Sequence, residues 1–256
     1  MNMSFREYIQ NPMGRKNAVM SNREILRTVY KEKLDKILVR EAGKVKYQLY
    51  HNKNKFVAHM KIPSEVVPNF YYDTVIEFTT DNPAYAVGSS LKDYNVKFYS
   101  NDPSFVYTFA HAMLSNDMFI RDLVPRMSKE AVKKVAVEKN PKNEVGYVKS
   151  IFFAYLLIEK YGLFNKIQYT TYGKPYNKKG LLAEVEHADT KIASRKTEGA
   201  KVRKRKKKDA SAEKTARKAE QLKNINIAAD HSIVAKRASV IQPNSTAKKA
   251  KTVKKI

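Results

Sequence analysis

The aromatic residues of this chain are confined to its first part. Every Phe and Tyr of the 256 residues lies at or before Tyr176. The last 66 residues, 191–256, hold 21 Lys and Arg against 5 Asp and Glu. A segment without aromatic side chains buries too little apolar surface to offset its ordering entropy. The sequence therefore predicts a part that folds, followed over 191–256 by a basic tail that is disordered or is ordered by a partner.

Composition excludes several classes of protein. The chain contains no Cys, so it has neither disulfides nor thiolate metal sites. No segment approaches the roughly 18 consecutive apolar residues of a membrane-spanning helix, so no membrane partner is expected. The first 20 residues lack the continuous apolar region of a secretory signal. We expect a soluble protein that is intracellular where it is made.

The first regular element expected is a helix. Residues 1–20 show no steady period and are interpreted as an N-terminal arm. After them, Ser21 and Glu24 have the spacing of a capping box, and Gly43 is suited to end a helix. Apolar residues between these points recur at helical spacing. The sequence therefore predicts a helix from Ser21 to Gly43 that packs on the domain core.

Alternating patterns follow the helix and predict a small, mainly antiparallel sheet. Apolar residues alternate over 45–49 and 56–62 around the turn sequence HNKNK, which is typical of a β-hairpin. Two further strands are expected around 72–78 and 94–98. Each of these strands ends at a polar turn that contains Asn, Asp and Pro.

Helical spacing returns after residue 103. Phe105, Phe109 and Met113 predict a helix, and a shorter one is expected from Ser128. Residues 143–164 are apolar nearly all round and predict a helix at the centre of the core, ended by Gly162. The order of helix, strands and helices indicates an α+β fold. The expected globular domain covers 21–169, with a linker over 170–190.

Catalytic patterns are nearly lacking from the sequence. The five His residues show no helical metal-binding spacing, and the eight Gly residues form no phosphate-binding loop. His111 is interpreted as a core or interface histidine. Asp73 and Glu77 share a strand face, and Asp81, Asp93 and Asp102 lie near turns; a metal-dependent nuclease would need such carboxylates to converge on a cation. That is the least favoured hypothesis, and no catalytic residue, metal or cofactor is expected.

The strongest signal is the sequence KVRKRKKK at 201–208. Seven cations in eight residues repel one another unless a polyanion neutralises them. No aromatic residue is interleaved, so contact with phosphates is expected and base stacking is not. A nuclear localisation signal and an RNA-threading tail are alternative meanings. The expected nucleic-acid-binding residues are Lys201, Arg203, Lys204, Arg205, Lys206, Lys207 and Lys208.

Two stretches carry a resemblance to a known group of proteins. DYNVKFYSNDPSFVYTFAHAML and NPKNEVGYVKSIFFAYLLIEKYGLF are similar to uncharacterised virion structural proteins of large tailed bacteriophages with low-GC genomes. The resemblance covers roughly residues 60–165, and the basic tail departs from it. It implies a component of the capsid or of the head–tail connection. It also implies location in the virion, and in the host cytoplasm during assembly, with packaged DNA as the polyanion.

The residues and the resemblance lead to one expected function. The chain is expected to be a non-enzymatic structural protein that contacts other virion proteins, or copies of itself, through its folded domain. Its basic tail is expected to contact nucleic acid. The alternative from another class is a nucleic-acid-binding accessory protein that acts on RNA or on replication intermediates.

Overall fold

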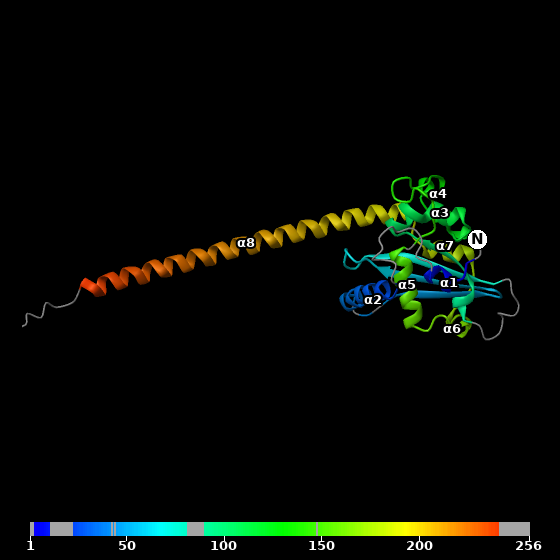
Figure 1. Cartoon of the computed structure of the whole chain (residues 1–256), viewed down its shortest axis with the longest axis horizontal. Coiled ribbons are helices and arrows are strands. Elements are labelled where there is room, and N and C mark those ends of the chain that lie inside the picture. The colour runs from blue at the N-terminus through cyan, green and yellow to red at the C-terminus, as the bar shows by residue number, and fades with distance from the viewer. Residues whose placement is uncertain are drawn as a thin grey trace, which may run out of the picture. The chain divides into compact units, whose positions relative to one another are not determined.

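The computed structural model describes residues 3–10, 23–41, 43, 45–80, 90–146 and 148–240 (Figure 1). The chain divides into two units with the boundary between Ala200 and Lys201. The first unit is an α+β domain, as the sequence predicts. Among the described residues, none of the helices combines the length and hydrophobicity that crossing a membrane requires.

The sheet has five strands in the order β4-β3-β2-β1-β5. All neighbours are antiparallel except β1 and β5, which are parallel. The predicted hairpin is confirmed, with Leu49 opposite Ala58. The strands are β1 (Tyr47–Asn52), β2 (Lys55–Pro63), β3 (Tyr71–Thr79), β4 (Asn95–Ser100) and β5 (Lys174–Pro175).

One face of the sheet is apolar and carries the main core. Helix α5 (Lys149–Lys160) packs across β2, β3 and β4, and α2 (Arg23–Arg40) packs against α5 (Figure 1). Residues Ile151–Ile158 of α5 are all buried, which confirms the predicted central helix. Gly162 follows it with a φ of +66°, a left-handed conformation that Gly adopts without strain. The predicted end of α2 is also confirmed, since Gly43 has a φ of +70°.

The N-terminal arm is partly described, and that part is docked. Helix α1 (Phe5–Gln10) places Phe5 among the rings of Phe78, Phe98, Tyr155 and Phe164, with centroid distances of 5.5–5.7 Å. The backbone N–H of Val96 donates to the carbonyl oxygen of Met3 at 3.0 Å. The arm therefore covers the outer edge of β4. Residues 11–22, which hold the predicted helix cap, lie outside the described residues.

Between β4 and α5 the predicted helices are shorter and more varied. A π-helix, η4 (Phe105–Phe109), leads into α3 (Ala110–Ser115), and α4 covers only Lys129–Lys133. A 3-10 helix, η5 (Arg121–Arg126), lies between α3 and α4, and another, η3 (Leu91–Asp93), precedes β4. The predicted turn at Asp81 lies outside the described residues.

Residues 170–190, expected to be a linker, are a packed part of the first unit. They include the end of α6 (Lys166–Tyr172), β5 and α7 (Lys178–Glu184). Leu181 and Val185 are fully buried. The linker prediction was wrong because Gly, Pro and Asn in this segment end or cap short elements. The Asn177 side chain, for example, accepts a hydrogen bond from the Lys179 N–H at the start of α7. The packed part of the chain thus extends well past residue 169.

The expected tail is helical over much of its length. Helix α8 (Ala188–Val240) contains the whole basic run. Lack of aromatic residues removes tertiary packing, but Ala, Lys, Arg and Glu are among the best intrinsic helix formers. Local propensity therefore favours a helix in a segment without aromatic residues.

Candidate functional site

The basic run lies on α8 and its described side chains are exposed. Those of Lys201, Arg203, Lys204 and Arg205 are exposed to solvent, and the run contains no acidic residue. Only the backbone is described for 206–208. With a rise of 1.5 Å and a rotation of about 100° per residue, eight helical residues cover about 12 Å. The four described cations of the run, which lie at different angles around the helix, therefore face solvent on more than one side.

Beyond the run, charges of both signs alternate. Asp209 and Glu213 are four residues apart, and the Glu213 carboxylate accepts a hydrogen bond from the Arg217 guanidinium at 2.6 Å. A Glu four residues before an Arg stabilises an exposed helix by about 0.2–0.5 kcal/mol. The ion pair after the run therefore stabilises α8, whereas the run 201–208 supplies the excess positive charge.

The first turns of α8 belong to the first unit and are firmly held there. Ala188 and Ile192 are buried. The Lys191 ammonium lies 4.6 Å from the centroid of the Phe70 ring and 3.0 Å from the Glu186 carboxylate. The helix that carries the basic run thus starts from a packed base and not from a linker.

Asp73, a residue of the nuclease hypothesis, helps to hold that base. It is fully buried in β3, and its Oδ2 accepts hydrogen bonds from the Glu186 N–H at 3.1 Å and from Asn101 Nδ2 at 2.9 Å. Its Oδ1 lies 2.7 Å from His59 Nε2 and 2.5 Å from Lys61 Nζ. The carboxylate therefore connects the sheet to the segment just before α8.

The pKa of Asp73 reflects these partners. Burial raises the pKa of the carboxyl, but hydrogen bonds and charges from His59 and Lys61 outweigh burial and lower it to about 2. Each oxygen of the carboxylate has two partners, so the group is saturated by contacts within the protein. An ionised, fully engaged carboxylate of this kind is typical of a structural anchor.

The other carboxylates of the nuclease hypothesis do not join Asp73. Glu77 shares its sheet face, as predicted, but lies 2.9 Å from Lys55 Nζ. Asp93 pairs with Arg6 at 2.8 Å, and Asp102 is hydrogen-bonded to the Ser104 N–H at 2.7 Å. Asp81 lies outside the described residues. In the described ranges no group of three His, Asp or Glu side chains has the arrangement of a metal site.

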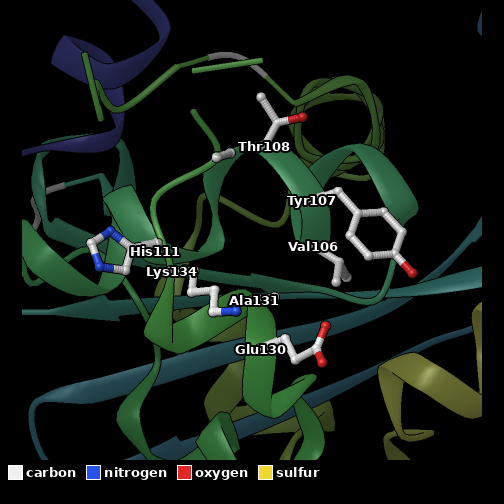
Figure 2. A pocket seen from close by; sticks show the side chains of 8 residues that line it. Val106, Tyr107, Thr108, His111, Glu130, Ala131 and Lys134 are labelled. Carbon is white, nitrogen blue, oxygen red and sulfur yellow. The ribbon is translucent and has the colours of Figure 1, made fainter. Parts of the chain in front are cut away.

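A shallow pocket of about 170 Å³ opens beside the π-helix (Figure 2). Its walls come from η4, α3, α4 and the residues after α4. Figure 2 shows the Tyr107 ring at one end and the His111 ring at the other. The pocket is lined by Val106, Tyr107, Thr108, His111, Glu130, Ala131, Lys134 and Ala136.

His111 is half-buried, and the structure gives it a hydrogen-bond partner. Its Nδ1 donates to the Asn143 side-chain oxygen at 2.9 Å. Asn143 has a φ of +51°, a conformation that Asn tolerates better than most residues. His111 therefore has a hydrogen-bond partner, and its ring borders a pocket that the sequence did not predict.

Sequence reasoning missed the residues that join distant segments. The His59–Asp73 contact and the anchoring of Glu186 each connect positions on different elements. A period-2 pattern places His59, Lys61 and Asp73 within strands but does not show what covers that face. The alternation in β2 and β3 was a usable signal. It places polar residues on the face opposite the main core, and that face must then contact either solvent or a network of polar groups.

No family model, curated protein or solved structure matches this chain. The residues and their geometry are therefore the grounds on which a function can be assigned.

Proposed function

We propose that this chain is a non-enzymatic structural protein of the virion type. Its first unit makes protein–protein contacts and α8 holds nucleic acid by its phosphates. The observation that carries the proposal is the run of seven cations in eight residues on a helix, exposed wherever its side chains are described. Double-stranded DNA carries one charge per about 1.7 Å of its axis, so a 12 Å cationic segment faces several phosphates.

The absence of aromatic residues from α8 defines the mode of binding. Without stacking or planar base contacts, the helix is expected to bind the phosphate backbone with no sequence preference. Because cations replace condensed counterions, affinity falls steeply as salt rises, by about 0.9 log units per phosphate contact for each tenfold increase in salt. Packaged DNA suits this mode, since a particle protein must bind whatever sequence lies beside it.

The virion assignment is supported by the resemblance of residues 60–165 to bacteriophage structural proteins. The first unit is also of a kind that suits assembly. Asp73, the one carboxylate of the nuclease hypothesis at the centre of a cluster, is saturated by contacts within the protein. A unit that functions through protein–protein contacts needs a suitable surface on a rigid fold, and it does not need a reactive group.

The test uses the full-length chain with the seven cations of the run replaced by Gln. Binding to mixed-sequence duplex DNA is measured at several salt concentrations. We expect the variant to lose most of its affinity and most of the slope of log affinity against log salt. A matched control replaces seven exposed lysines of the first unit and should retain both: Lys31, Lys36, Lys46, Lys53, Lys160, Lys174 and Lys179.

Two results would contradict the proposal. If both variants lose affinity equally, binding depends on total charge and not on α8. If neither binds less than the natural sequence, the nucleic-acid site lies elsewhere. Sedimentation of the same two variants tests the assembly role, because removal of the cations should leave self-association or association with particle proteins unchanged. Full-length protein found only on RNA or replication intermediates in cell extract would favour the accessory-protein alternative.

A further inference from the structure

The pocket beside the π-helix has a rigid frame. Asn140 is buried, and its Nδ2 donates to the carbonyl oxygens of Thr108 at 3.2 Å and Glu144 at 2.8 Å. Its Oδ1 accepts from the Glu144 N–H at 3.1 Å. One side chain thus fixes the loop after α4 to the π-turn. π-helical turns occur often at functional sites, and a pocket between fixed walls needs no ordering on binding.

The size and lining of the pocket limit what it can hold. At about 170 Å³ it is smaller than the roughly 300–1,000 Å³ of pockets that enclose drug-sized ligands. Val106, Ala131 and Ala136 make much of the wall apolar, and Tyr107 remains 45% exposed at one end. Such a pocket fits one apolar side chain, which is how anchor residues bind at protein interfaces.

The surroundings of the pocket are basic. Residues 129–142 carry five lysines and two glutamates, and all seven of these side chains are exposed. Lys134 lines the pocket, and the Lys139 ammonium lies 5.8 Å from the centroid of the Tyr107 ring. Cations around an apolar pocket attract acidic partners and repel basic ones. A second copy of this chain, with a net charge of +25, is a poor match.

We propose that this pocket binds an apolar side chain, Phe or Leu, presented by an acidic segment of a partner protein. The inference rests on the proposal that the first unit works through protein contacts and names the surface that does so. The partner's side chain enters between η4 and α4. Its flanking carboxylates lie against the lysines of 129–142.

The test titrates isotope-labelled full-length protein with capped pentapeptides and follows backbone amide shifts. The probes are Asp-Glu-Phe-Glu-Asp, the same peptide with Leu or Ser at the centre, and Lys-Lys-Phe-Lys-Lys. We expect the Phe or Leu peptide to shift amides of 106–111 and 130–136. Binding should weaken about 10-fold or more with Ser, as is usual when a pocket loses its apolar group. Residue-resolved shifts separate this site from charge-driven binding to the basic run.

Two variants connect the shifts to the pocket. Ala131→Leu fills it, and Tyr107→Ala opens one end at a half-exposed position that tolerates truncation. Both should weaken the Phe peptide about 10-fold. The matched control is Tyr172→Ala on α6, where the side chain is 72% exposed and no change is expected.

Three outcomes would overturn the inference. They are equal binding of the Ser peptide, shifts restricted to residues outside the two segments, and no shift in them with any acidic peptide up to about 10 mM. Displacement of the Phe peptide from these residues by single-stranded DNA would also count against a protein partner. None of these results depends on α8. Retention of duplex binding by the Gln variant of the basic run would therefore be a separate failure, which affects the nucleic-acid proposal alone.

Discussion

The two units of the chain differ in whether their charged side chains have partners of opposite charge nearby. In the first unit a buried charge is matched by its neighbours, as when Asp73 lies against Lys61, His59 and the Glu186 N–H. In the basic run of α8, seven cations stand together with no acidic residue among them. The first arrangement stabilises a fold and the second costs free energy until an anion arrives. The charges of the first unit are thus explained by its structure, whereas those of the run indicate a partner outside the chain.

The largest expected effect is at the charge cluster. Asp73→Ala leaves Lys61 and His59 without their carboxylate in a buried site, which costs about 3–5 kcal/mol of unfolding free energy. Urea denaturation measures the loss. The control Asp93→Ala removes a half-exposed pair with Arg6, where a change of about 0–1 kcal/mol is expected. Similar small losses in both variants would show that the cluster is not the anchor described.

The next effect tests the segment expected to be a linker. Leu181 is fully buried in α7, so Leu181→Ala should cost about 2–5 kcal/mol through lost burial and the cavity left behind. Ile167→Ala in α6 is the matched change at an exposed aliphatic residue, since the Ile167 side chain is 63% exposed and little burial is lost. Equal midpoints of urea unfolding for the two variants would mean that 170–190 is a linker after all.

A smaller effect depends on pH. The carboxyl of Asp73 has a pKa of about 2 in the fold against an ordinary value of 3.8. Because the folded pKa is depressed, its contribution is complete above the unfolded pKa and is lost as pH falls from about 4 through 2. The two values correspond to about 2 kcal/mol. The natural protein and Asp73→Asn should therefore converge in stability over this window, and parallel curves from pH 5 to 2 would contradict the assignment.

The smallest effect on the first unit is expected from a break in α8. Ala210→Pro removes a helical hydrogen bond and disfavours the helix locally by about 3 kcal/mol. Far-ultraviolet circular dichroism should show a loss of helix, while the unfolding free energy of the first unit stays within about 0.5 kcal/mol of that of the natural protein. The control Ala210→Ser should change neither. An unchanged spectrum would show that this part of α8 is not helical in the free chain.

Local patterns predicted most elements of the first unit. The hairpin, the central helix and the left-handed Gly43 and Gly162 follow from alternation, apolar content and the conformational freedom of Gly. Local patterns could not predict the tertiary contacts between segments that are distant in the sequence. Leu181 and Val185 are apolar residues in a segment rich in Gly, Pro and Lys, and only the surface they meet shows that they are buried.

Of the candidate sites, one could be predicted from the sequence and the others could not. The basic run is visible in the sequence because charge density is a local property. The pocket is not, because Tyr107 and Lys134 come from separate elements whose approach depends on Asn140. The same holds for Asp73, whose partners lie 12, 14, 28 and 113 positions away.

The cover over β4 has a consequence for how copies of this protein meet. An uncovered edge strand offers free backbone groups to another sheet, and growth by strand addition has no natural end. Here Met3 and Phe5 bond to Val96 and Tyr94, and Met118 and Ile120 bond to Phe98 on the same edge. Trimming only a few residues from the N-terminus would reopen part of that edge. Loss of these residues to proteolysis is therefore expected to favour strand pairing between copies of the protein.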